Sequence, residues 1–295
     1  MGSWGAGLYS GDFAADLRAA VSAVARLPFD GDRLVEILSD VEPEASRNTS
    51  DDDHTTFWLV VADQFARRGI VSSHAQTRAL AIMESGADER SLAARGMTAT
   101  GLAKRRVLLA QLRAKVESVA HRARTGVLKK PQPFLMEIGD VFSYPTSNGR
   151  CINSYYPSKS KIPGWVENGW GAAVVVDRGL AFDFLAWYRL IALETSVVEC
   201  PTFDDLNDAT TEWVVHRPGT CSRVHFTRLE LGRVGRIQID PARSLETVGP
   251  LRPGVYQAIH DISIANELGT FPTSDDPGRP LSQKLAVIRG LKALQ

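Results

Sequence analysis

The arrangement of apolar residues changes at two closely spaced prolines, Pro131 and Pro133. Before them, apolar side chains recur every three or four residues, as in helices, and after them they alternate or form short runs, as in strands. Proline lacks an amide hydrogen and restricts its own backbone, so a helix does not continue through this segment. The 295 residues leave room for two domains with separate cores. We therefore predict an all-helical domain over 1–128, a linker over 129–133 and a β-rich domain over 134–295.

The helical domain is expected to hold about six helices. Ser, Thr or Asp residues begin most of them, and Gly69 and Gly86 follow two of them as stop signals. The polar segment 41–53 is expected to be a loop. The predicted helices cover 12–27, 32–39, 53–68, 72–85, a short stretch from 88, and a long stretch from Thr98 or Thr100 to Arg124.

The second domain is predicted to be an antiparallel sheet with one or two helices, so the whole chain is α+β. Asn148-Gly149 favours a type I′ turn, and a hairpin is expected around Asp177-Arg178-Gly179. The predicted strands cover 136–144, 151–156, 172–176, 180–187, 188–193, 213–216, 224–231 and 237–240, and the predicted helices cover 256–268 and 282–294.

Charge and cysteine content limit the classes of partner and compartment. Lys and Arg total 34 and Asp and Glu total 34, so no net field attracts nucleic acid or an anionic membrane. The most apolar run, 170–193, contains four charged residues, which excludes a membrane-spanning helix and leaves no membrane partner. Three cysteines without CxxC spacing, and no N-terminal signal, predict a cytoplasmic protein.

Asp51-Asp52-Asp53-His54 combines hard oxygen ligands with an imidazole, a composition that a metal site uses. Adjacent residues rarely converge on one ion, however. Acids at the start of a helix are explained by capping and by the helix dipole. We therefore predict neither a metal nor a cofactor.

The last predicted helix of the first domain is basic. Lys104, Arg105, Arg106 and Arg113 could bind nucleic acid if this helix formed one continuous patch with Lys159 and Lys161. No aromatic residues are interleaved with them, so a solvated helix face is the favoured interpretation. Nucleic-acid binding is kept as an alternative function.

No sequence motif of a known catalytic class is present, and we assign no catalytic residue. Cys221 and His225 are four positions apart on a predicted strand, which separates them by ~13 Å. A thiolate–imidazole pair would need another element, for instance Cys151 with His216 or His225. A half-buried strand face explains these residues better, and an enzyme remains a second alternative.

The long loop from Tyr155 to Trp170 is the best candidate for function. Aromatic residues and cations of this kind are enriched at protein interfaces. The alternative is that the tryptophans fold back onto the β core, because a long loop must either pack or bind. The predicted partner-binding residues are Tyr155, Tyr156, Lys159, Lys161, Trp165 and Trp170.

Two stretches resemble known bacterial families. The opening Met1-Gly-Ser-Trp-Gly-Ala-Gly, the following Asp12-Phe-Ala-Ala-Asp16 and the later Ala62-Asp63-Gln64 resemble the DUF4259 family. Gly139-Asp-Val-Phe-Ser-Tyr-Pro145, followed by the turn at Gly149, resembles the start of the Imm26-type immunity proteins, which neutralise toxins delivered between bacteria. The resemblance implies a bacterial immunity or defence protein that binds a protein partner, such as a toxin, through its β-rich domain, and it supplies no catalytic residues.

Overall fold

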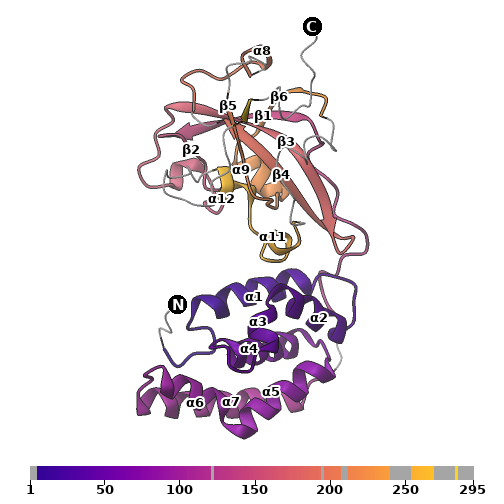
Figure 1. Cartoon of the computed structure of the whole chain (residues 1–295), viewed down its shortest axis with the longest axis vertical. Coiled ribbons are helices and arrows are strands. Elements are labelled where there is room, and N and C mark those ends of the chain that lie inside the picture. The colour runs from indigo at the N-terminus through magenta and orange to yellow at the C-terminus, as the bar shows by residue number, and fades with distance from the viewer. Residues whose placement is uncertain are drawn as a thin grey trace. The chain divides into compact units, whose positions relative to one another are not determined.

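The structure, a computed structural model, describes residues 5–120, 123–193, 196–206, 212–239, 254–268 and 283–284. The chain divides into two compact units, Met1–Lys130 and Pro131–Gln295 (Figure 1). The described part of the first unit is helical, and the second unit holds an antiparallel sheet with short helices. The α+β prediction is confirmed. The division falls between Lys130 and Pro131, inside the segment expected as a linker.

Helix α4 (His54–Arg68) is the centre of the first unit. Every residue from Phe57 to Phe65 is buried, and a helix buried on all sides needs neighbours on all sides. Helix α2 (Gly31–Val41) packs against α1, α3 and α5. The helices that surround α4 are α1 (Asp12–Val24), α3 (Pro43–Arg47), α5 (Ser73–Ser85), α6 (Ala87–Ala94) and α7 (Ala99–Glu117).

The helix ends follow the capping residues. Ser72 and Thr98 accept hydrogen bonds from the N–H groups three residues on, 3.1 and 3.2 Å away, and Gly69 and Gly86 end α4 and α5 with positive φ. Two expectations were wrong. Helix α3 occupies part of the predicted loop 41–53, because Pro43 suits a first helical turn. Helices α1 and α7 end at Val24 and Glu117 rather than at 27 and 124.

All strand pairs of the sheet are antiparallel, in the order β2-β1-β3-β4-β5-β7 with β6 also beside β1. The predicted turn is confirmed, since Asn148 and Gly149 have φ of 49° and 77°. Strand β1 begins later than the predicted 136 and strand β2 stops well short of the predicted 156. The strands are β1 (Asp140–Ser147), β2 (Arg150–Cys151), β3 (Gly169–Ala181), β4 (Leu185–Leu193), β5 (Glu212–Val215), β6 (Gly232–Arg236) and β7 (Gln283–Lys284).

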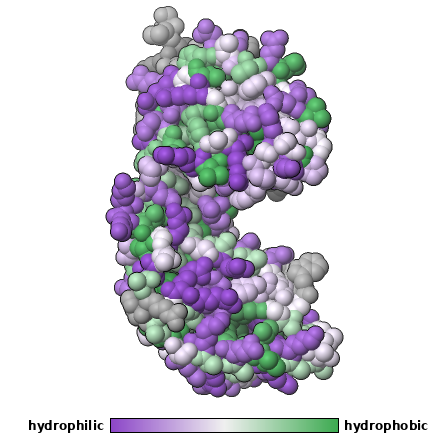
Figure 2. All heavy atoms as spheres, turned by 180° about the vertical axis from the view of Figure 1, so that it is seen from behind, coloured by the Kyte–Doolittle hydropathy of each residue, from purple (hydrophilic) through white to green (hydrophobic). Residues whose placement is uncertain are grey.

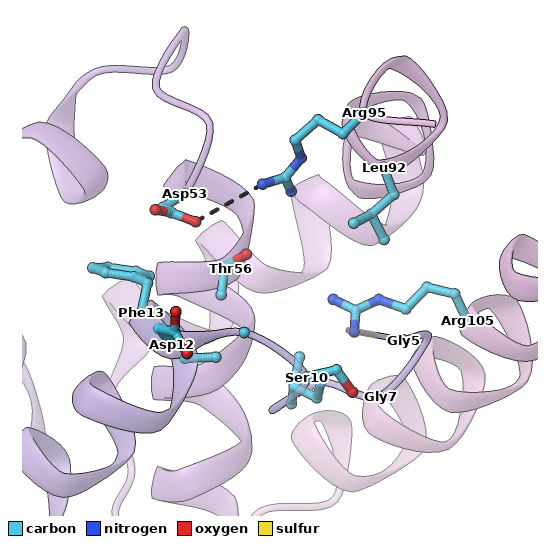
Figure 3. Close-up of a pocket in the computed structure, with 13 residues that line it drawn as sticks. Gly5, Gly7, Ser10, Asp12, Phe13, Asp53, Thr56, Leu92, Arg95 and Arg105 are labelled. Atoms are coloured by element: carbon cyan, nitrogen blue, oxygen red, sulfur yellow. Dashed lines mark ion pairs between the residues drawn. The ribbon is translucent and has the colours of Figure 1, made fainter. Parts of the chain in front are cut away.

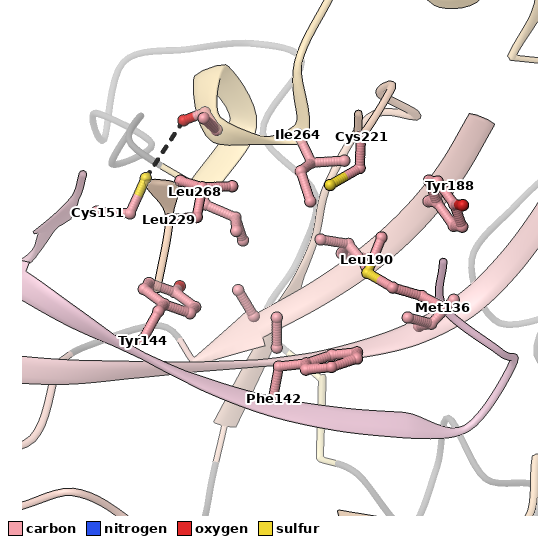
Figure 4. Packing of buried hydrophobic residues seen from close by; sticks show 14 of the residues in the cluster. Met136, Phe142, Tyr144, Cys151, Tyr188, Leu190, Cys221, Leu229, Ile264 and Leu268 are labelled. Atoms are coloured by element: carbon pink, nitrogen blue, oxygen red, sulfur yellow. Dashed lines mark hydrogen bonds between the residues drawn. The ribbon is translucent and has the colours of Figure 1, made fainter. Parts of the chain in front are cut away.

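Side chains of β3 alternate between two separate cores. Val174 belongs to a cluster with Trp213 of β5 and with Leu206 of α8 (Phe203–Leu206). Val175 belongs to the opposite cluster, which Figure 4 shows, with residues of α12 (Ile264–Leu268) and Leu229. Because both faces of the sheet are covered, the strand reads as a continuous apolar run.

The predicted hairpin turn at 177–179 was wrong. Strand β3 continues through these residues to Ala181, and the chain turns over Phe182–Phe184, where Phe182 and Asp183 have φ of 52° and 63°. Gly179 lies opposite Trp187 in the sheet. A Cβ at this position would lie 2.6 Å from the indole ring. The glycine therefore makes space for a tryptophan and does not form a turn.

The segment predicted as a strand over 224–231 is helix α9 (Arg223–Arg228), because Ser222 accepts the His225 N–H at 3.1 Å and begins a helix. Strand β6 lies before the predicted range 237–240. The predicted helix 256–268 is two short helices, α11 (Val255–Ile259) and α12, separated at Asp261, whose φ is 50°. Of the predicted helix 282–294, residues 283–284 form β7, and the rest lies outside the described residues.

Candidate functional site

The segment between β2 and β3, called loop 152–168 here, is held in place by ion pairs. Lys159, in the short 3₁₀ helix Lys159–Lys161, donates to a carboxylate oxygen of Glu167 at 2.8 Å and of Glu230 at 2.9 Å. These hydrogen bonds raise the pKa of Lys159. Lys159 therefore ties the loop to Glu230, two residues beyond the end of α9 (Arg223–Arg228), whereas Lys161 is exposed.

The two tryptophans of the loop region are both partly buried. Trp165 is partly buried against the core cluster of Figure 4, beside Ile162. Trp170 lies in β3, opposite Pro145. The exposed aromatic residues are Tyr155 and Tyr156, which are 55% and 36% exposed. The rigid surface that the loop offers to a partner is therefore made by the tyrosines.

A groove of about 930 Å³ opens beside Tyr156. The indole N–H of Trp165 is buried and has no hydrogen-bond partner among the described residues. The groove combines two aromatic rings with amide groups and one guanidinium. Its polar and aromatic lining consists of Ser147, Asn148, Arg150, Asn153, Tyr156, Trp165 and Asn266.

Sequence reasoning missed most of the polar groove residues. Asn148 was noticed only as a turn residue, and Arg150 follows that turn on β2. Asn266 comes from α12, far along the chain. Loop aromatics could be found from composition, but the amides from three segments meet only in the folded unit.

Tyr155, near the start of the loop, contacts His225 and Asp261. Its ring meets the His225 imidazole edge-on, with ring centroids 5.5 Å apart, and its hydroxyl donates to the Asp261 carbonyl at 3.5 Å. Desolvation by burial lowers the pKa of His225. The His225 imidazole of α9 therefore packs against the loop.

The cysteines proposed as alternative nucleophiles point into the core (Figure 4). Cys151 donates its S–H to the Ala265 carbonyl at 3.4 Å. Burial raises the pKa of both Cys151 and Cys221 to about 12. A thiol must ionise to act as a nucleophile, so both behave as small core residues.

The alternative Cys–His pairs are not brought together by any contact among the described residues. Cys221 precedes α9, so Cys221 and His225 do not share the strand face that we expected. Burial lowers the pKa of His216 to about 4. A histidine of this kind stays neutral at pH 7 and packs beside the sheet.

Three arginines of α7 pair with acids of the first unit. Arg105 is 4% exposed and its Nε and Nη2 atoms donate to the Asp88 carboxylate at 2.8 and 3.0 Å. Arg105 therefore does not belong to an exposed basic surface, contrary to its candidate role. Arg106 pairs with Glu89 and Arg113 with Glu84, both at 2.5 Å, and Lys104 is exposed.

Figure 3 shows what Arg105 does instead. It lies at a small cavity of about 40 Å³ between the N-terminal segment and α4, and its Nη1 donates to the Ala6 carbonyl at 3.4 Å. At the same cavity Arg95 and Asp53 form an ion pair at 3.9 Å. Asp53, which precedes the first residue of α4, thus pairs with Arg95, which follows the last residue of α6.

Among the described residues, no group of three His, Cys, Asp or Glu side chains is placed to hold a metal ion. The described helices include none that is both long and apolar enough to span a membrane. On the face of the molecule seen in Figure 2, hydrophilic and hydrophobic residues are interspersed over each unit.

Comparisons with known proteins add no relative. No protein-family model, no curated protein and no solved structure matches the chain.

Proposed function

We propose that the second unit binds a protein partner through loop 152–168 and the adjoining groove. The observation that supports this most is that two exposed tyrosines and Val166, which is 63% exposed, stand on a loop held by the two ion pairs of Lys159. Tyrosine contributes a large contact area at interfaces, and a loop that is already ordered loses less entropy on binding.

The lining of the groove suits an extended segment of the partner's chain. The side-chain oxygens of Asn148 and Asn153 already accept hydrogen bonds from Asn168 and from the Tyr155 N–H, which fixes the two amides and leaves their NH₂ groups as donors for a peptide C=O. Asn266 supplies a further amide from α12. Tyr156 and Trp165 supply apolar faces for its side chains. The volume of about 930 Å³ lies within the roughly 300–1,000 Å³ of ordinary ligand sites.

The resemblance of Gly139–Pro145 to the immunity proteins makes a bacterial toxin the partner that we propose first. Such a protein would act by occupying the toxin, without turnover. The buried cysteines are consistent with this reading, and so is the pairing of Arg105, Arg106 and Arg113. Neither alternative function, catalysis or nucleic-acid binding by α7, is favoured by a contact in the structure.

The test compares two exposed tyrosines of the second unit. The tagged full chain is used to isolate partners from bacterial extract at high salt, and the retained protein is then titrated with purified variants. Tyr156→Ala is expected to weaken binding by more than about 1 kcal/mol. Tyr256→Ala, which removes a 45% exposed tyrosine that does not line the groove, is expected to leave affinity unchanged.

Equal affinity of the wild type and Tyr156→Ala would refute the groove as the binding surface. An equal loss of affinity in Tyr156→Ala and Tyr256→Ala would also refute it, because Tyr256 does not line the groove. Trp165→Ala is a poorer probe, because its ring also packs on the core and its loss lowers stability.

A further inference from the structure

The first unit contains a pocket lined by four arginines, called the arginine pocket here. It has a volume of about 310 Å³ and lies where the ends of α1 and α4 meet the segment that follows α7. Alanine and threonine complete the wall, and no aromatic residue lines it. The lining residues are Ser22, Ala25, Arg26, Arg67, Arg68, Ala123, Arg124 and Thr125.

Two of the guanidinium groups, those of Arg67 and Arg68, donate hydrogen bonds to residues of α4 and α1. Arg67 Nε donates to the buried Asp63 carboxylate at 2.6 Å. Arg68 donates to the Gln64 carbonyl at 3.2 Å and to the Ser22 hydroxyl at 2.8 Å. A guanidinium has five N–H donors, so each group keeps donors for a ligand.

The other two come from the chain segments next to the end of α1. Arg124 Nη2 donates to the Phe29 carbonyl at 2.6 Å. The Leu128 N–H donates to the Arg26 carbonyl at 2.8 Å, which holds the two segments together. The guanidinium of Arg26 has no hydrogen-bond or ion-pair partner among the described residues. It is therefore the donor most available to a ligand.

The positive charge of the pocket is not balanced by the described residues. Asp63 is the acid paired with Arg67, and it also pairs with Lys115 at 2.8 Å. The C-terminal ends of α1 and α4 offset part of the rest, at roughly half an elementary charge each. Four arginines and Lys115, less Asp63, the Asp30 that acts on Arg124 and the two helix ends, leave about two positive charges.

The partial burial of Arg68 and Arg124 also favours a bound anion. Desolvation by burial lowers the pKa of Arg68. Among its charged neighbours, Tyr9 and Asp63 raise this pKa, whereas Arg18 and Arg67 lower it. Desolvation also lowers the pKa of Arg124. Cations that are partly buried beside one another are stabilised by a bound anion, which replaces the lost hydration.

We propose that the arginine pocket binds the phosphate group of a small phosphorylated molecule. Planar guanidinium groups match phosphate oxygens in pairs, and converging arginines are typical of phosphate recognition. A nucleic acid strand would also need surfaces on which its bases stack, and no aromatic residue lines the pocket. This site lies in the first unit and shares no lining residue with the groove.

The experiment is calorimetric titration of the full chain with inorganic pyrophosphate at low salt. Saturable binding is expected, and Arg26→Gln is expected to weaken it at least about tenfold, since one charge-assisted contact is lost. Arg90→Gln, which changes an exposed arginine of α6 outside the pocket, is the matched control and should bind like the wild type. Unchanged melting temperatures would show that both variants fold.

Absence of saturable binding, or equal binding by Arg26→Gln and Arg90→Gln, overturns the proposal. A short single-stranded DNA is titrated in parallel. If DNA bound more tightly than pyrophosphate and Arg26→Gln weakened the DNA binding, the pocket would belong to a nucleic-acid surface, and the small-molecule proposal would fail.

Discussion

Arg105 and Arg106 are adjacent in sequence, yet one is inside the first unit and the other is on its surface. The side chain of Arg105 is 4% exposed and that of Asp88 is 1% exposed, whereas that of Arg106 is 65% exposed. The two ion pairs look alike in distance, at 2.8 and 2.5 Å. Their energetic roles differ, because a buried charge that loses its partner cannot be solvated by water.

Asp88→Asn is therefore expected to destabilise the protein by about 3–5 kcal/mol, since it leaves Arg105 buried without a counter-charge. Glu89→Gln, which removes the partner of exposed Arg106, is expected to cost less than about 1 kcal/mol. Chemical denaturation of both variants measures the difference. Similar losses in the two variants would contradict the assignment of Arg105 to the interior.

His216 predicts a pH dependence of stability. Its folded pKa is lowered to about 4 by burial, while the unfolded value is near 6.5. Between these two values the unfolded chain binds more protons than the folded chain, so stability falls as the pH drops from about 6.5 to about 4. Melting temperatures of the wild type should fall more over this window than those of His216→Gln. Parallel curves would show that His216 is not buried as a neutral ring.

At the scale of single elements, glycines have two distinct uses in this chain. Gly69 and Gly86 end helices with φ of 65° and 67°. Gly179 lies within β3, and its missing side chain is replaced by the ring of Trp187 from β4. Gly179 was mistaken for a turn residue because it follows Asp177-Arg178, a polar pair of the kind that precedes the glycine of a tight turn.

Gly179→Ala is expected to destabilise the second unit by about 1–3 kcal/mol, because the added methyl group overlaps the Trp187 ring at 2.6 Å. Gly232→Ala is the control in the neighbouring part of the sheet, where the nearest atom to the new Cβ would be 3.4 Å away. Unfolding midpoints in urea compare the two. A loss of stability in Gly232→Ala as large as that in Gly179→Ala would contradict the close contact between Gly179 and the Trp187 ring.

At the scale of the whole molecule, each unit has a core of its own. In the first unit, α4 lies among five other helices. In the second, two clusters cover the two faces of one sheet. Each unit also carries its own candidate site, the arginine pocket in the first and the groove in the second.

A fragment of residues 1–130 is therefore expected to fold by itself. It keeps every helix from α1 to α7, and it should show a helical circular dichroism spectrum with a cooperative thermal transition. A fragment ending at Arg95 is the control, because it loses the buried residues Leu109, Leu112 and Val116 of α7. A non-cooperative transition in the longer fragment would show that its core is incomplete.

The fold class and most helix positions were predictable because they depend on interactions within a few residues. Apolar spacing selects helix before Pro131 and strand after it, and caps such as Ser72 and Thr98 act on the next turn of the chain. The turn at Asn148-Gly149 has the same local origin. Aromatic residues in loop 152–168 likewise marked that segment as a candidate surface before the structure placed them.

Only the tertiary structure decided which of these side chains are available. Trp165 packs on the core while Tyr155 stays exposed, and Arg105 is paired inside while Arg26 has no partner among the described residues. The arginine pocket draws on positions 26, 67–68 and 124, and the groove draws on β2, its loop and α12. Local sequence specifies local conformation. The burial and pairing of a side chain depend on residues that are distant in sequence and become neighbours only when the cores form.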